Sequence, residues 1–167
     1  MISMRMVAIP TKIAEEVRSM QKDPHYGFPA YTATAKGSAP CRHCLRRIER
    51  NEQATLFTYD AFDGQESLPL PGPVYIHAKP CERYPEDAGF PADFRHQRTL
   101  TAYGRGRKVI AQEYPNAENI EAKVQQLFAR AAVDYIHVRS TDAGCYTFRI
   151  ERADERGNRR QSSESLG

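Results

Sequence analysis

The feature that most constrains this chain is a pair of segments that together carry three thiols and one imidazole. Cys41 and Cys44 are separated by two residues in the first segment, and His77 and Cys81 are separated by three in the second. A Cys-x-x-Cys spacing can place both sulfurs on one side of a tight turn, and a His-x-x-x-Cys at a strand end can complete a tetrahedral set. If one metal ion binds all four, the fold must bring the two segments together.

Zinc is the metal that this ligand set favours, because mixed thiolate and imidazole ligation in a tetrahedral frame suits it better than iron. Four protein ligands leave no position for water, so such a site would be structural rather than catalytic. The alternative needs no metal. Free cysteines are often buried as small hydrophobic residues, and His77 lies in an apolar strand where a hydrogen-bonded histidine is ordinary.

A short repeat extends this hypothesis, because Tyr75-Ile76-His77 recurs as Tyr135-Ile136-His137. Alternation along a strand places the tyrosine and the histidine of each copy on one face. If the two strands are sheet neighbours, both histidines would line one surface, as in a small-molecule pocket. His137 and Cys145 would then be substitute metal ligands, and the alternative is coincidence with ordinary surface packing.

An enzyme is the rival from another functional class. Cys145 follows His137 and Arg139 in the sequence, and cationic neighbours would stabilise its thiolate and raise its nucleophilicity. A metal ion with one ligand replaced by water would be a second route to catalysis. The catalytic candidates are therefore Cys145, His137 and Arg139.

A redox pair formed by Cys41 and Cys44 is the third possibility. Arg42 and His43 stand between the two cysteines and would lower the thiol pKa. The pair lacks the thioredoxin-like context, in which Cys-x-x-Cys opens a helix directly after a strand. In a reducing compartment a Cys-x-x-Cys is nevertheless a metal or redox pair more readily than a structural disulfide.

Arginines cluster around the first cysteine pair and suggest an anionic ligand. Arg42, Arg46 and Arg47 lie close together, and guanidinium groups bind phosphates and carboxylates. The alternative is a solvated basic face. The net charge of the chain is +3, which is too small to indicate nucleic-acid binding.

Length and composition fit one cytoplasmic domain. The 167 residues suffice for an ordinary core, and 40% of them are hydrophobic, so the chain is not disordered by composition. The N-terminus shows no secretory pattern, and no apolar stretch approaches the length that crosses a bilayer. We therefore expect no membrane partner.

Hydrophobic periodicity predicts an α+β fold in residues 1–153 and a disordered tail in residues 154–167. We expect one mostly antiparallel sheet of about five to seven strands with two main helices packed on one face. The expected helices cover residues 11–20 and 116–132, with Asn116 as the N-cap, one or two helical turns after Cys44, and an ordered loop over residues 23–40. The expected strands cover residues 5–9, 53–60, 74–79, 100–103, 109–114, 133–139 and 145–152.

Three segments resemble a known family. They are Pro40-Cys41-Arg42-His43-Cys44-Leu45, Gly72-Pro73-Val74-Tyr75-Ile76-His77-Ala78 followed by Cys81, and His137-Val138-Arg139 followed by Gly144-Cys145-Tyr146. The mainly bacterial family that they resemble is domain of unknown function 1203, and the resemblance covers most of residues 40–153. That family has no assigned activity, substrate or cofactor, so the resemblance implies a single compact bacterial domain and no particular reaction.

The leading functional expectation is a small cytoplasmic binding or accessory protein with a structural zinc site at Cys41, Cys44, His77 and Cys81. An enzyme that uses a metal-bound water or the Cys145 thiol is the alternative. The Cys41–Cys44 redox pair comes third.

Overall fold

Ten strands and two α-helices form the fold in residues 1–153, the part of the chain that the computed structural model describes. Residues 154–167, where we expect a tail, lie outside the described residues. In chain order the elements are β1 (Met4–Val7), α1 (Thr11–Met20), β2 (Tyr31–Thr34), β3 (Ala39–Pro40), β4 (Arg47–Ile48), β5 (Gln53–Asp60), β6 (Pro71–His77), the 3-10 turn η1 (Ala92–Phe94), β7 (Arg98–Tyr103), the 3-10 turn η2 (Arg105–Arg107), β8 (Val109–Glu113), α2 (Ile120–Phe128), β9 (Tyr135–Ser140) and β10 (Tyr146–Arg152).

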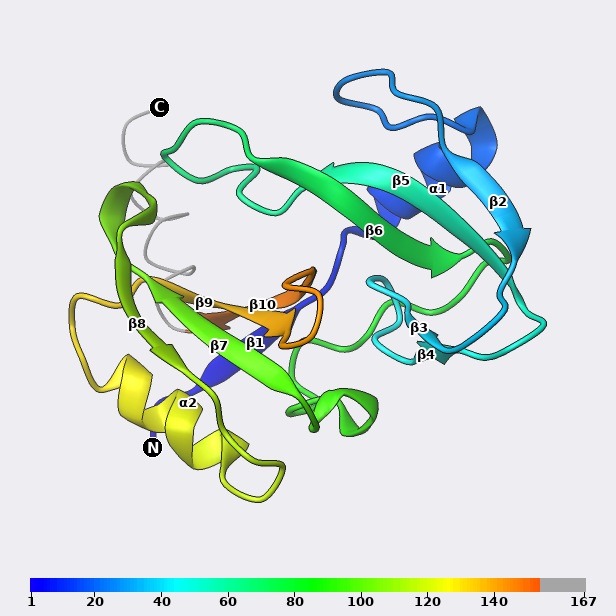
Figure 1. The fold of residues 1–167 in the computed structure, drawn as a ribbon. Helices are drawn as coiled ribbons and strands as arrows, with labels where there is room; N and C mark the ends of the chain where they lie inside the picture. Colours follow the sequence, from blue (N-terminus) through cyan, green and yellow to red (C-terminus); the bar gives the residue numbers. More distant parts are fainter. Residues whose placement is uncertain (154–167) are drawn as a thin grey trace.

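The expected α+β class and antiparallel pairing are confirmed, but the strands divide into three sheets rather than one. The first sheet has the order β1-β10-β9-β7-β8, the second β2-β5-β6, and the third is the β3-β4 hairpin (Figure 1). Every pair is antiparallel. The predicted hairpins that join β7 to β8 and β9 to β10 are both present, because local turns hold strands that follow one another in the chain.

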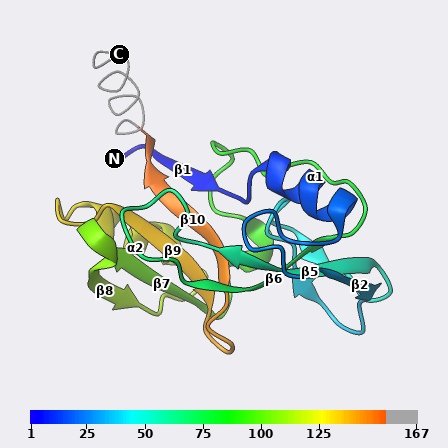
Figure 2. The same cartoon turned by 90° about the horizontal axis from the view of Figure 1, so that it is seen from above.

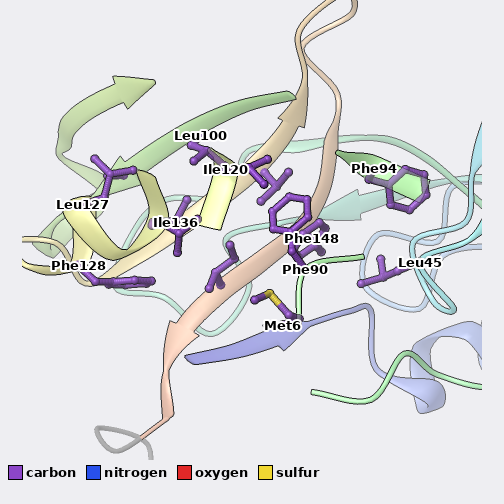
Figure 3. Close-up of a cluster of buried hydrophobic side chains, with 14 of the residues drawn as sticks. Met6, Leu45, Phe90, Phe94, Leu100, Ile120, Leu127, Phe128, Ile136 and Phe148 are labelled. Atoms are coloured by element: carbon purple, nitrogen blue, oxygen red, sulfur yellow. The ribbon is translucent and has the colours of Figure 1, made fainter. Parts of the chain in front are cut away.

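Helix α2 covers one face of the five-stranded sheet. Its buried residues pack into a cluster with side chains from β7, β9 and β10, and burial of each large apolar side chain contributes about 1.5–3 kcal/mol. Figure 3 shows Leu127 and Phe128 of α2 at one end of this cluster and Leu45 and Phe94 at the other. This cluster, the core beneath α2, therefore extends from α2 to the turn that follows Cys44.

Helix α1 packs on the three-stranded sheet, so the expectation that both helices share one sheet face is wrong. Ala14 and Val17 are buried with Phe57 of β5 and Ile76 of β6, and Figure 2 shows α1 beside this sheet. The reason lies in the connection from β1. After β1 the chain leaves the five-stranded sheet, and the Ile9 N–H donates to the Arg42 carbonyl at 2.9 Å before α1 begins beside the three-stranded sheet.

Two expectations for residues 23–50 are also wrong. The expected loop contains the strands β2 and β3, and all four residues of the edge strand β2 are exposed, so no alternation of buried residues marks it in the sequence. The expected helical turns after Cys44 are replaced by β4. Leu45 has a φ of 54°, a left-handed conformation that ends any right-handed helix.

Helix α2 covers Ile120–Phe128 and is therefore shorter than the helix expected over residues 116–132. Asn116 does not cap it. The Asn116 side chain accepts the N–H groups of Glu118 and Asn119 at 3.1 and 2.9 Å, which closes a separate turn before the helix. Among residues 1–153, no helix has the length and apolar character needed to cross a membrane.

Candidate metal centre

The four side chains that the sequence singled out as metal ligands come together in the structure. The ligand atoms of Cys41, Cys44, His77 and Cys81 all lie within 4.8 Å of one another. Cys41 and Cys44 are buried, and His77 and Cys81 are half-buried. These residues form a potential metal-binding site, here called the Cys3His cluster.

The β3–β4 hairpin presents the first two thiols. The Cys41 N–H donates to the Arg46 carbonyl at 3.0 Å, and the Leu45 N–H donates to the Cys41 carbonyl at 2.9 Å. These bonds close a tight turn that faces Cys41 and Cys44 toward one point, as a Cys-x-x-Cys spacing permits. Ala39 pairs with Ile48 at the base of the turn.

Strand β6 supplies the second half of the cluster. His77 is its last residue and pairs with Ala54 of β5, and its backbone N–H donates to the Cys41 sulfur at 3.3 Å. The chain then turns, so that the Cys81 sulfur lies 3.9 Å from the Cys41 sulfur. Two segments far apart in the sequence therefore meet at the end of β6.

Two of the distances between the ligand atoms match the edges of a tetrahedron around zinc. The Cys41 and Cys81 sulfurs are 3.9 Å apart, and the Cys44 sulfur lies 3.4 Å from His77 Nδ1. With zinc bonds of about 2.3 Å to sulfur and about 2.05 Å to nitrogen, the tetrahedron's edges are about 3.8 Å between sulfurs and about 3.6 Å between sulfur and nitrogen. Both measured distances lie within about 0.2 Å of these edges.

Glu52 orients the imidazole of His77. His77 Nε2 lies 3.2 Å from a Glu52 carboxylate oxygen, so this nitrogen carries the proton and Nδ1 faces the thiols. The same oxygen accepts the Glu49 N–H at 2.7 Å, and this bond followed by that of His77 lowers the pKa of Glu52. A carboxylate behind a histidine ligand is the usual support at zinc sites, because it sets the tautomer and raises ligand basicity.

Helix α1 and His43 surround the Cys81 sulfur with donors. Arg18 Nη2 lies 3.2 Å from the sulfur and His43 Nδ1 lies 3.1 Å from it. Because His43 Nδ1 donates to the sulfur, its Nε2 accepts the Thr11 hydroxyl at 2.9 Å. Arg18 also donates from Nε to the His77 carbonyl at 3.0 Å. The first and the eighth residue of α1 thus both contact the cluster's periphery.

Thr11, Arg18 and Glu52 were not predicted from the sequence as parts of a site, whereas His43 was expected to lower the thiol pKa of the Cys41–Cys44 pair. His43 alone carried a usable signal, because it stands inside the Cys-x-x-Cys segment. Thr11 and Arg18 lie on α1 and Glu52 directly precedes β5, and only the packing of these elements brings them to the cluster.

Hydrogen bonds within the cluster shift the pKa values of its members in opposite directions. Hydrogen bonds from Cys41 and Cys44, and further ones from His43 and His77, lower the pKa of Cys81 far below that of a free thiol. Cys41 and Cys81 raise the pKa of Cys44, and the same two residues raise the pKa of His77 to about 10. A metal ion would have to displace protons from Cys44 and His77, so we expect any metal binding to strengthen as pH rises.

A pocket of about 550 Å³ opens beside the cluster. Cys44, His77 and Cys81 contribute to its wall together with charged side chains. The cluster is therefore within reach of a chelator, although two of its thiols are buried.

His137 does not approach the cluster, because β6 and β9 are not sheet neighbours, which was the condition for their histidines to line one surface. The two strands belong to different sheets. The His137 ring, 1% exposed, is packed among aromatic rings whose centroids lie 4.6 to 5.2 Å away. Burial, followed by the charges of Arg149 and Arg139, lowers its pKa well below the ordinary value. The tyrosine and histidine repeat is therefore a coincidence of two strands that pack differently.

The catalytic candidates Cys145, His137 and Arg139 line one pocket of about 390 Å³. Within residues 1–153 no hydrogen bond joins Cys145 to His137, and the Cys145 thiol donates to the Ala143 carbonyl at 3.8 Å. Cys145 lies outside the Cys3His cluster, so it is not a substitute ligand.

The three arginines considered for an anionic ligand separate in space. Arg42 is buried, and desolvation lowers its pKa to about 10. Arg46 lines the pocket beside the cluster, whereas Arg42 lines a different pocket and Arg47 lines both.

Comparison with known proteins gives one match. The family model described as protein of unknown function, DUF1203, matches residues 38–152, which include the whole cluster and the segment from His137 to Cys145. No curated protein and no solved structure matches the chain.

Proposed function

The chain belongs to the DUF1203 family of proteins of unknown function, and we propose that it is a zinc-binding accessory protein. Cys41, Cys44, His77 and Cys81 would hold the ion. The observation that carries this proposal is the convergence of the four ligand atoms within 4.8 Å of one another, with two distances, 3.9 and 3.4 Å, that fit the edges of a zinc tetrahedron.

The charge around the cluster supports the proposal. A zinc ion with three thiolates and one neutral imidazole carries a net charge of −1, and leaving it uncompensated at a half-buried site is costly. The Arg18 guanidinium lies 3.2 Å from the Cys81 sulfur and offsets this charge. N–H groups of His43 and of the His77 backbone donate to two of the sulfurs and disperse the rest.

The role of the ion is structural in this proposal, because four protein ligands leave no open position for water. The ion joins the β3–β4 hairpin to the end of β6, and Thr11 and Arg18 tie α1 to the same point through His43 and Cys81. The ion would then stabilise the surfaces through which the protein acts.

Elemental mass spectrometry of untagged protein tests the proposal. We expect about one zinc ion per chain, and we expect Cys41→Ser, Cys44→Ser and Cys81→Ser each to lose it, because three ligands bind far more weakly than four. Cys145→Ser is the matched control, since it removes a thiol outside the cluster and should keep the metal. A metal-free protein in which all four thiols react without a chelator would contradict the proposal.

The same thiol count separates zinc binding from a redox role. A Cys41–Cys44 redox pair would lose two titratable thiols under a mild oxidant, whereas zinc would protect Cys41, Cys44 and Cys81, so that the protein keeps all four thiols and these three react after chelation. A reversible loss of two thiols from metal-loaded protein would favour the redox pair.

A further inference from the structure

A third pocket, of about 570 Å³, lies where the two larger sheets meet. Its wall includes the β3–β4 hairpin, β6, the segment from η1 to β7 and the loop that joins β9 to β10. In size it falls in the range of small-molecule sites. We call it the inter-sheet pocket, and it shares only Arg47 with the pocket beside the Cys3His cluster.

A buried cation without an ion pair lines this pocket. Arg42 is 3% exposed, and its Nε and Nη1 donate to the carbonyls of Tyr146 and Pro40 at 2.9 and 3.0 Å. No carboxylate pairs with it within residues 1–153. Carbonyl groups satisfy hydrogen bonds but carry no net charge, so the positive charge is buried uncompensated, which is costly.

Two more guanidinium groups face the same space. Arg98 lies over the Phe94 ring at 5.1 Å, and its buried Nε has no hydrogen-bond partner within residues 1–153. The Arg47 side chain donates to the Asp93 carbonyl at 3.4 Å and forms no ion pair in that part of the chain. Against these three cations the pocket wall has one acidic side chain, the exposed Asp142.

We propose that the inter-sheet pocket binds a small organic anion. Its carboxylate or phosphate group would lie between Arg42 and Arg98, because planar guanidinium groups bind both anions with paired hydrogen bonds. Its apolar body would pack against Leu56, Tyr75 and Phe94, which line the same wall. The proposal rests on the arginines and does not depend on which metal, if any, the cluster binds.

Cys145 supplies a local reporter for this site. It is half-buried and lines the inter-sheet pocket together with Arg42 and Arg98. A bound anion would therefore hinder the approach of iodoacetamide to its thiol. Peptide mass mapping reads the alkylation of Cys145 separately from that of the other three cysteines.

Binding of phenyl phosphate and of benzoate to the full chain, measured by calorimetry, tests the proposal. We expect saturable binding of at least one of them, slower alkylation of Cys145 in its presence, and weaker binding of inorganic phosphate, which lacks the apolar body. Comparison of the first two probes shows whether the site prefers phosphate or carboxylate. Benzyl alcohol, the neutral analogue, should bind at least tenfold more weakly, because hydrogen bonds to charged groups contribute about 1.5–3 kcal/mol.

Arg98→Gln should weaken binding of the preferred anion by about tenfold or more, because it removes a charged hydrogen-bond donor. Because Arg98 makes no side-chain hydrogen bond within residues 1–153, this variant is expected to fold. Arg50→Gln is the matched control, since Arg50 is exposed near the same hairpin and does not line the pocket. Three results would overturn the proposal: neither anion binds, Arg98→Gln binds like the wild type, or benzyl alcohol competes equally. None of them depends on the zinc measurement.

Discussion

Glu52 shows how a single residue outside the ligand set shapes the cluster. Its carboxylate lies 3.2 Å from His77 Nε2 and leaves Nδ1 as the nitrogen that faces the sulfurs. Without this acceptor the ring can rotate and exchange tautomers. The orientation of the His77 ring is therefore set by Glu52, which directly precedes β5, and not by β6, the strand that carries the histidine.

We predict that Glu52→Gln lowers zinc affinity by about 10- to 100-fold, because the amide is a weaker acceptor and leaves the imidazole less basic. Competition with a chromophoric chelator measures this. Glu49→Gln is the control, since Glu49 contributes its backbone N–H to the network and not its carboxylate. Equal affinities for the two variants would show that Glu52 does not orient His77.

A second prediction for a single residue concerns His137 and the pH dependence of stability. Its pKa is well below the ordinary value when folded, because it is buried beside Arg149 and Arg139. The unfolded chain takes up a proton at this residue near pH 6.5 and the folded chain does not. Since the unfolded state then binds more protons, stability falls as pH decreases, by up to about 1.4 kcal/mol for each pH unit below about 6.5.

His137→Phe should therefore reduce the loss of stability between pH 7 and pH 5. Urea unfolding of variant and wild type at both values measures the difference, and zinc-dependent effects common to the two proteins cancel. His96→Gln is the control, because it removes the imidazole of an exposed histidine. An identical pH dependence in His137→Phe and the wild type would rule out His137 as the cause.

Of the helices α1 and α2, α1 is the one that contacts the cluster. It is ten residues long, and no side chain caps its N-terminus. Helices of this length are marginal by themselves, so tertiary contacts must hold them. Ala14 and Val17 are buried in the core between α1 and the three-stranded sheet, while Thr11 and Arg18 contact His43 and Cys81, respectively.

Chelation of the metal should raise amide hydrogen exchange in α1 and leave α2 nearly unchanged, because α2 packs on the other sheet. Exchange followed by mass spectrometry, with and without a chelator, measures this. Arg18→Met should raise exchange in α1 even with metal bound, since it removes the bond to Cys81. Equal responses of α1 and α2 to chelation would contradict a local role for the ion.

At the scale of the whole molecule, the cluster joins two hydrophobic cores. Cys41 and Cys44 pack into the core beneath α1, whereas the next residue, Leu45, is 1% exposed and belongs to the core beneath α2. The turn after Cys44 therefore reaches both cores. A metal ion that holds this turn would therefore add to the free energy of global unfolding, besides its local effect on α1.

The melting temperature should then rise with free zinc concentration. Above the dissociation constant, each tenfold increase in zinc adds about 1.4 kcal/mol to the free energy of unfolding. Calorimetry in metal buffers measures the dependence, which Cys44→Ser should abolish and Cys145→Ser should retain. A melting temperature that does not vary with zinc would exclude metal-linked stability.

Local patterns in the sequence determined much of this protein. The helix at residues 11–20, the strand at residues 53–60 and the hairpins that end in β8 and β10 were predictable, because periodicity and turns depend on near neighbours in the chain. The approach of Cys41, Cys44, His77 and Cys81 was predictable for another reason. Their spacings are ones that a shared metal can use.

Only the tertiary structure decided how those pieces are placed. The division into separate sheets depends on hydrogen bonds such as that from Ile9 to Arg42, and β2 is an exposed edge strand without a buried pattern. Glu52 and Arg18 reach the cluster through contacts between residues far apart in the sequence. Periodicity records which residues are buried but not which distant partner buries them, and for that reason packing alone set the surroundings of the cluster and the inter-sheet pocket.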